Sequence, residues 1–418
     1  MKRNLVIVWM IMVAFFVISF VTNILGPIMP EATKDIHLTL AQAGILPFAF
    51  FIAYAISIPA GYMLEKFGSK FVIILAFIIG TVGSLIFSAH PNYFSYLTTL
   101  FIVGICVAML QVAFWPLLRT SGGEENYSFY SVLTQIFFGA ASFISPFVYS
   151  YLMLNLPHNA DANLFLTVMS KLVPASLPWV SIYWLNAAIM VVMIVIICFI
   201  KFPQVELKED EKVEGFKTII PLLENKVVII YFIGIFAYVG MEQGISVWIS
   251  KFLQDFHGYD SVTVGASAVA WFWALQSIGS LLGIVLLKLY DVKNILKVFL
   301  FLQLIALSCA LFGSAKVSLI SFPVCGFLTS VMYGSIFSLG MNSLKTHHGS
   351  FSGILCTGVI GGAIVPLLVG ALGGVTSLRY GMCLVYLTIL YMLYIALSAK
   401  PIVDNKTVKL SELLKKAD

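Results

Sequence analysis

A short charged segment separates two long uncharged runs near the start of the chain: GYMLEKFGSK, residues Gly61–Lys70. The run that leads into it covers residues 41–64, and the run that follows covers residues 71–90. About 20 apolar residues in a helix cross the roughly 30 Å hydrocarbon layer of a bilayer, so both runs are long enough to span one. The segment therefore predicts a tight charged turn between two membrane-spanning helices.

The whole chain repeats this pattern of apolar runs and short polar connections. Of its 418 residues, 60% are hydrophobic and 10% are charged, whereas soluble domains average about 45–50% apolar and about 25% charged. The apolar runs are continuous rather than alternating, which excludes a β-barrel. This composition excludes soluble, nucleic-acid-binding and disordered proteins. It predicts an all-α integral membrane protein.

Uncharged stretches predict about twelve transmembrane helices. Only the connections at residues 155–177 and 201–226 are long. The expected spans lie near residues 5–28, 41–64, 71–90, 96–118, 127–154, 178–200, 227–250, 261–287, 298–315, 318–343, 351–373 and 380–399.

The basic residues predict the orientation of the chain. With a cytoplasmic N-terminus, 19 of the 24 Lys and Arg residues fall on the cytoplasmic side. Cytoplasmic loops of membrane proteins carry an excess of Lys and Arg. We therefore expect both termini to be cytoplasmic.

The longest charged stretch, KEDEKVEGFK, lies near the middle of the chain at Lys208–Lys217. It divides the expected spans into two groups of six. We expect an N-terminal bundle over residues 1–200 and a cytoplasmic linker over 201–226, then a C-terminal bundle over 227–400 and a cytoplasmic tail over 401–418.

Charges at matching positions suggest that the two halves are repeats. Glu65 and Asp291 each follow the second span of their half, and Arg119 and Lys345 each end a fourth span. Both pairs are 226 residues apart (291 − 65 and 345 − 119). A shared offset favours parallel repeats related by an axis along the membrane normal.

The segment Gly61–Lys70 resembles the loop motif of the major facilitator superfamily, G-x-x-x-D-R-x-G-x-R. The resemblance implies a fold of two six-helix bundles. It also implies a gating loop, in which the charged side chains form ion pairs or meet helix ends and latch one closed state. Glu replaces the Asp of the motif and Lys replaces its Arg residues. The positions are filled by Gly61, Glu65, Lys66, Gly68 and Lys70.

Four further segments resemble one branch of that superfamily, the fucose/glucose/galactose permeases. That resemblance implies uptake of a neutral hexose or deoxyhexose across a bacterial inner membrane. The segments are AFFIAYAISIPAG (Ala49–Gly61), YVGMEQG (Tyr238–Gly244), SVMYGSIFSLG (Ser330–Gly340) and GGAIVPLLVGALGG (Gly361–Gly374).

The chain departs from this branch at the acidic positions. Leu25 and Gly26 stand where the branch has Asn-Asp, and Gln111 stands where the fucose permease has Glu. The span-five pattern Gln-x-x-Asn keeps Gln135 but has Phe138 in place of Asn. The carboxylates that the resemblance would nominate for proton coupling are therefore missing.

Glu242 is the one acidic residue expected within a span. Of the other 18 acidic residues, five are expected on the external side of the membrane and 13 on the cytoplasmic side. It lies 15 residues from Val227, or roughly 22 Å along a helix, which places it at or beyond the bilayer midplane. An isolated charge there costs on the order of 3 kcal/mol, so such residues usually face a cavity and mark a functional path. We expect Glu242 to bind substrate and to exchange a coupling proton. The alternative is a protonated, hydrogen-bonded structural residue.

The other polar groups in the spans suit a neutral polyol. Amides donate and accept hydrogen bonds as sugar hydroxyls do, and tryptophan offers a flat face for a sugar ring. No Lys or Arg is expected mid-span, which disfavours anionic substrates. Hydrogen bonds between helices are the alternative role for each amide. The candidate substrate-binding residues, besides Glu242, are Asn23, Gln111, Gln135, Gln243, Gln276 and Trp115.

These observations predict a secondary active transporter rather than an enzyme. We expect uptake of a neutral monosaccharide by alternating access, coupled to a proton through Glu242. Two alternatives stay open: a facilitative sugar uniporter, and efflux of an organic cation with Glu242 as counter-charge. No catalytic constellation or Cys/His cluster is present, so we expect no cofactor or metal site. The expected coupling ion is a proton, with sodium as the alternative. We expect a monomer whose partners are sugar and membrane lipid, with no nucleic acid.

Overall fold

The described part of the protein is helical, with no strand in it. The computed structural model describes residues 4–123, 127–158, 163–202, 222–344 and 348–401. Most of the expected linker, residues 203–221, and nearly all of the expected tail, 402–418, lie outside the described residues. The proposed division at 201–226 therefore stays a prediction.

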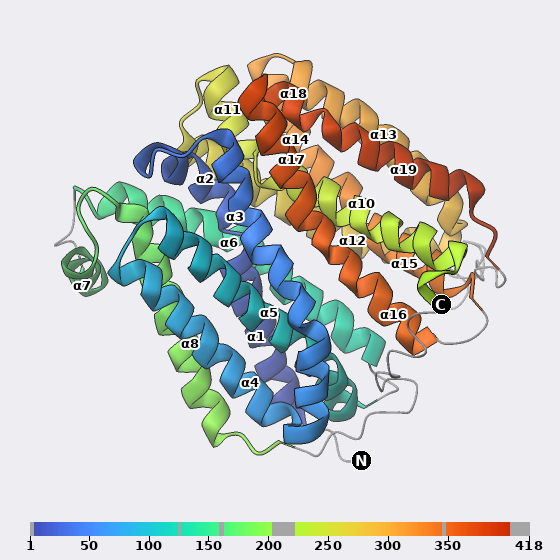
Figure 1. Ribbon diagram of the computed structural model, residues 1–418, viewed down its shortest axis with the longest axis horizontal. Coiled ribbons are helices and arrows are strands. Elements are labelled where there is room, and N and C mark those ends of the chain that lie inside the picture. Colours follow the sequence, from blue (N-terminus) through green and yellow to red (C-terminus); the bar gives the residue numbers. More distant parts are fainter. Residues whose placement is uncertain (1–3, 124–126, 159–162, 203–221, 345–347, 402–418) are drawn as a thin grey trace, which may run out of the picture.

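The first half of the chain forms one group of packed helices (Figure 1). Within it α4 packs against α5 and α8, and α1 packs against α6. The elements are α1 (Leu5–Thr22), α2 (Leu25–Asp35), α3 (Leu40–Ile52), η1 (Ala53–Ile56), α4 (Ser57–Ala89), α5 (Tyr93–Gly122), α6 (Tyr127–Asn155), α7 (Leu164–Leu172), η3 (Pro178–Val180) and α8 (Ser181–Phe199).

The second half forms a second group, in which α12 packs against α14, and α10 packs against α17 and α19. Its elements are α10 (Lys226–Ser246), α11 (Ile249–His257), η5 (Ser261–Gly265), α12 (Ala266–Leu289), α13 (Val292–Phe312), α14 (Ala315–Thr329), α15 (Met332–Met341), α16 (His348–Thr357), η6 (Gly358–Ile360), α17 (Gly361–Val375), α18 (Leu378–Met382) and α19 (Leu384–Ser398).

Among the described residues, 11 helical stretches are long and apolar enough to cross a membrane. The expected second span, 41–64, is built from α3, η1 and the first turns of α4. Its apolar part, Leu40–Ile56, is shorter than the other stretches. The all-α, multi-pass class predicted from the sequence is confirmed.

The first and seventh expected spans are interrupted at corresponding places. The first breaks between α1 and α2 at Asn23, and the seventh breaks between α10 and α11 at Val247, 224 residues later (247 − 23). Pro27 has no N–H, so the carbonyl of Asn23 lacks the donor that a continuous helix would supply. In the seventh span the amide of Trp248 donates to the carbonyl of Ile245 at 3.1 Å, which makes a tighter turn.

The two halves meet through α3 with α17 and through α6 with α12. A Cβ added to Gly44 would lie 3.0 Å from the carbonyl oxygen of Pro366, so the backbones of α3 and α17 nearly touch. At one end α2 also packs on α11, and the Ser261 hydroxyl donates to Glu31 Oε1 at 2.9 Å. Figure 1 places α2, α11 and α18 at this end and the N-terminus at the opposite end. The halves are therefore joined at the end that carries α2 and α11, which we call the α2/α11 end.

Candidate functional site

Glu242 lies on α10, one turn before the break, and neighbouring side chains hold its carboxyl group. The Tyr238 hydroxyl donates to Glu242 Oε1 at 2.6 Å, and Gln276 Nε2 of α12 donates to the same oxygen. Gln276 Nε2 also lies 3.2 Å from the Tyr238 hydroxyl. Because the donors converge on one oxygen, the carboxyl is fixed in one orientation. We call Tyr238, Glu242 and Gln276 the carboxyl cluster.

Aromatic rings extend the carboxyl cluster toward α15. Tyr333 meets Tyr238 edge to face, with ring centroids 5.5 Å apart. Tyr333 also stacks on Phe337 at 5.9 Å. The aromatic rings beside Glu242 therefore come from α10 and α15.

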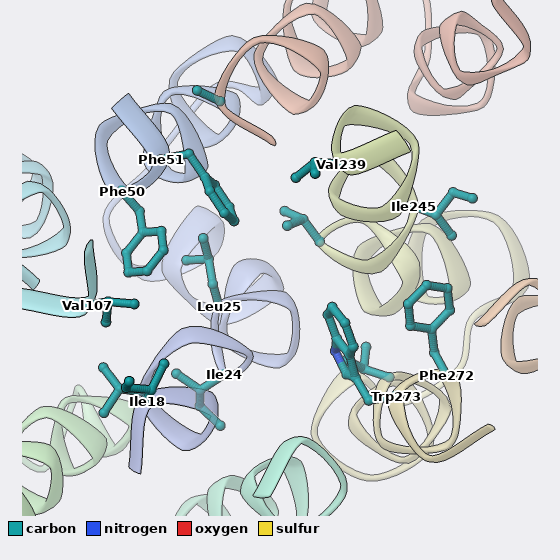
Figure 2. Packing of buried hydrophobic residues seen from close by; sticks show 14 of the residues in the cluster. Ile18, Ile24, Leu25, Phe50, Phe51, Val107, Val239, Ile245, Phe272 and Trp273 are labelled. Carbon is teal, nitrogen blue, oxygen red and sulfur yellow. The ribbon is translucent and has the colours of Figure 1, made fainter. Parts of the chain in front are cut away.

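A second polar pair belongs to the first half. Gln111 Nε2 on α5 donates to the Tyr54 hydroxyl on η1 at 3.2 Å. Tyr54 stacks on Phe51 with centroids 6.0 Å apart. A Cβ added to Gly362 would lie 3.2 Å from both Phe51 and Gln243, so this wall is close to α10. Figure 2 shows Phe51 on one side and Val239 and Trp273 on the other. The first half, which carries Tyr54 and Gln111, and the second half, which carries Glu242, therefore approach each other around Gly362.

Asn23 and Gln243 lie nearer the α2/α11 end. Asn23 Nδ2 donates to the Ser142 hydroxyl at 2.8 Å and lies 3.2 Å from Ser19 Oγ, so its amide nitrogen joins α1 to α6. Asn23 and Gln243 also line a small pocket with Ser246 and Trp273. The pocket has room for about one water molecule and is too small for a sugar.

Trp115 and Gln135 belong to neither cluster. Trp115 packs on Phe15 of α1, with ring centroids 5.0 Å apart. Gln135 is exposed on α6, and within the described chain no hydrogen bond reaches it. The structure therefore brings Glu242 together with Gln276 in the second half, and Gln111 together with Tyr54 in the first. It does not place Trp115 or Gln135 with them.

The charged turn Gly61–Lys70 contains a sharp change of direction at Gly68, where φ is +78° and ψ is 165°. Lys70 Nζ donates to the carbonyls of Cys198 and Ile200 at 2.9 Å each, which caps the end of α8. Lys66 is exposed and Gly61 is half-buried, and the side chain of Glu65 lies outside the described residues. The contacts of Lys70 stay within the first half, and a latch between the halves remains a prediction.

Sequence reasoning missed the three tyrosines of the central region. Tyr238 had a usable signal, because it precedes Glu242 by four residues and so shares its face of the helix. Tyr54 and Tyr333 had none, since each meets its polar neighbour only through packing between helices. Because 14% of the chain is aromatic, a tyrosine in a central site is difficult to distinguish by sequence from one that faces lipid.

The fold and these clusters define a class of protein: a multi-pass helical membrane transporter with two bundles around a central polar region. In the part of the chain that the structure describes, no group of three or more His, Cys, Asp or Glu residues could hold a metal ion. A family model described as Major Facilitator Superfamily matches residues 11–366. The chain belongs to that superfamily, and the prediction of a membrane transporter rather than an enzyme is confirmed.

Curated relatives resemble this chain in sequence, and solved structures resemble it in fold. The glucose/galactose transporter of Brucella abortus is 29% identical over 364 residues, covering 86% of this chain and 85% of that one. The L-fucose-proton symporter of Escherichia coli is 26% identical, covering 88% and 87%. The crystal structure of the E. coli fucose:proton symporter matches with a TM-score of 0.65 and 21% identity, covering 96% of this chain and 100% of that one. A bacterial homologue of the human lysosomal transporter Spinster, solved inward-facing and unoccupied, matches with a TM-score of 0.78 and 13% identity, covering 94% and 96%.

Proposed function

We propose that this protein takes up a neutral monosaccharide, a hexose or deoxyhexose, by alternating access. The observation that carries the proposal is a polar wall in each half: Tyr54 with Gln111 in the first half, and the carboxyl cluster in the second. Each wall presents a phenol and an amide, which donate and accept hydrogen bonds as sugar hydroxyls require. Phe51 and Tyr333 add aromatic faces beside these groups.

The chemistry of the walls favours an uncharged substrate. Among the groups described in the central region, Glu242 is the one that can carry a full charge. An anionic substrate would normally meet Arg or Lys, and neither wall supplies one. The names of the relatives, glucose/galactose transporters and an L-fucose-proton symporter, support the same substrate class.

We further propose that Glu242 carries the coupling proton. Its carboxyl is shielded within the bundle and held by Tyr238 and Gln276, so a proton can join or leave it only when the transporter exposes the central region. Intramembrane carboxyls commonly serve proton relays in transporters. Without this step, the same walls would make a facilitative sugar uniporter.

The predicted orientation assigns a transport state to the structure. If both termini are cytoplasmic, as the distribution of basic residues predicts, the α2/α11 end faces the outside. The halves are joined at that end, so the central region would open toward the cytoplasm. Uptake then requires the two bundles to rock and reverse these contacts.

The test is transport by purified protein in liposomes, with radiolabelled glucose, galactose and fucose. We expect Glu242→Gln to retain sugar exchange between equal concentrations on both sides and to lose accumulation driven by a proton gradient. Glu224→Gln is the matched control, because Glu224 is an exposed acid at the edge of the second half. Accumulation that survives in Glu242→Gln would remove the proton role. If no hexose exchanges, and lipophilic cations are transported in its place, the sugar proposal fails.

A further inference from the structure

The short helix α7 leaves large apolar side chains exposed along one face. It has nine residues and lies in the long connection between the fifth and sixth expected spans. Its inner face packs on the bundle, where Leu166 and Met169 are buried. Four apolar side chains make up its outer face, and they are between 41% and 80% exposed. They are Leu164, Phe165, Val168 and Leu172.

A third side of α7 is polar. Successive residues of a helix are about 100° apart around its axis, which places Thr167, Ser170 and Lys171 in one sector. Both the apolar outer face and this polar sector run along most of the helix. A helix of this kind suits a position along the boundary between lipid and water, because each side then meets the medium it prefers.

A hydrogen bond fixes the level at which α7 begins. Asn163 Oδ1 accepts from the amide of Leu166 at 2.9 Å and so caps the helix. Nδ2 of the same side chain donates to the Tyr151 hydroxyl of α6 at 3.1 Å. Tyr151 lies one turn from the end of the membrane-spanning stretch Leu133–Asn155, and tyrosine is enriched where membrane meets water. The start of α7 is therefore level with the bilayer surface.

The helix η3, which follows α7, shows at which end of the molecule this surface lies. The Trp179 indole of η3 donates to Asp35 Oδ2 at the end of α2, at 3.0 Å, so α7 belongs to the α2/α11 end. The two halves are joined there, so Tyr151 and Leu154, both exposed on α6, face outward to lipid. The lipid-facing side of α6 thus continues into α7.

We propose that α7 binds the lipid bilayer, with its apolar face in the boundary between headgroups and acyl chains of the leaflet at the α2/α11 end. A second copy of the chain or another protein is the alternative occupant. Four partly exposed side chains offer less than the roughly 800 Å² per partner that a stable protein interface buries. The bilayer, in contrast, already surrounds the neighbouring span.

The test measures the depth of spin labels on α7 by electron paramagnetic resonance. The purified full-length protein, with its native cysteines replaced, carries Val168→Cys in vesicles of phosphatidylcholine and phosphatidylglycerol, without sugar. We expect the label to meet dissolved oxygen more often than a water-soluble nickel chelate, and to lie about 5–10 Å below the lipid phosphates. Leu164→Cys, at the most exposed position of the same face, should give the same result if the first variant does not fold.

Ser170→Cys provides the matched control, because Ser170 lies two positions from Val168 and on the polar side of the same helix. Its label should lie at or above the phosphates and meet the nickel chelate more often than oxygen. Equal access of the chelate to both labels would place α7 in water and overturn the proposal. A Val168 label that meets neither reagent would show that protein covers the face, which also overturns it. Neither result bears on sugar transport, which the liposome assay tests separately.

Discussion

The chemistry of Glu242 depends on the groups that hold its carboxyl oxygen. Tyr238 and Gln276 direct donors at Oε1, and hydrogen bonds to charged groups contribute about 1.5–3 kcal/mol each. A carboxyl fixed in this way can meet a sugar hydroxyl without first being reoriented. If Glu242 binds the sugar as proposed, the phenol of Tyr238 contributes to substrate binding as well as to packing.

At the residue scale we predict that Tyr238→Phe weakens hexose binding by about 10-fold to 100-fold, since one donor to the carboxyl is lost. Equilibrium binding of radiolabelled sugar to purified protein measures this. Tyr380→Phe is the control, because Tyr380 is 61% exposed on α18 and should bind as the unmodified protein does. Unchanged affinity in Tyr238→Phe would show that Glu242 does not meet the sugar.

The sequence predicts only part of this site. Glu242 stands out because hydropathy isolates one acid inside a span, and Tyr238 follows from the four-residue spacing. The Tyr54–Gln111 contact joins residues 57 positions apart and depends on how η1 tightens the chain beside α5. Sequence patterns describe one helix at a time, so contacts of this kind become visible only when the helices are packed.

At the scale of elements, the charged turns tie the ends of the helices together in both halves. Lys70 caps α8 in the first half, and Lys293 Nζ lies 3.4 Å from the carbonyl of Ala399 at the end of α19 in the second. Both lysines lie in the turn that follows the second expected span of their half. Each contacts the end of the last expected span of the same half. Lys70 can reach the end of α8 only if its turn keeps a fixed shape, and the backbone conformation of Gly68 allows that shape.

We predict that Gly68→Ala lowers the stability of the protein by about 1–3 kcal/mol. At φ +78° and ψ 165° the backbone occupies a region essentially limited to glycine. An added Cβ would meet nothing within 4 Å, so the cost comes from the backbone alone. Thermal unfolding in detergent, with Gly334→Ala as control, measures it. Gly334 is also free of neighbours within 4 Å but has no positive φ, so Gly334→Ala should not lower stability. A Gly68→Ala variant as stable as the control would contradict the argument.

The helices themselves were largely predictable, whereas their interruptions were not. Long apolar runs are sufficient to place the spans, because the bilayer requires about 20 such residues. Hydropathy does not register a bend within a run, so the break at Val247–Trp248 left no mark in the sequence. Pro27 gave a partial signal for the break in the first span. The charged turn at Gly61–Lys70 was located correctly, but α4 runs through it and changes direction at Gly68.

At the scale of the whole molecule, the contact between α3 and α17 holds the halves together near the α2/α11 end. Gly44 and Gly370 allow the two backbones to approach, and a Cβ on Gly370 would collide with the carbonyl of Leu40 and lie 3.1 Å from Gly44 Cα. Small residues permit such close packing of membrane helices. This packed contact must separate and re-form in every transport cycle if the halves alternate.

We predict that Gly370→Ala opens the α2/α11 end and slows hexose transport about tenfold, because the added methyl group raises the free energy of the closed contact by roughly 1–3 kcal/mol. Distances between spin labels at Lys34 and Lys316, which are exposed residues on α2 and α14, measure the opening in a background without native cysteines. The label separation should lengthen in Gly370→Ala.

Gly374→Ala separates this effect from a general disturbance of α17. Gly374 lies one turn further along the same helix and faces the same partner, but a Cβ there would make only ordinary contacts, at 3.7 Å and beyond. Its label separation and transport rate should match the unmodified protein. If the two variants behave alike, the close approach at Gly370 does not control the state of the transporter. If instead only Gly370→Ala lengthens the distance, the joined end is a contact that the transport cycle opens, because a single methyl group has shifted the balance between two arrangements of otherwise rigid bundles.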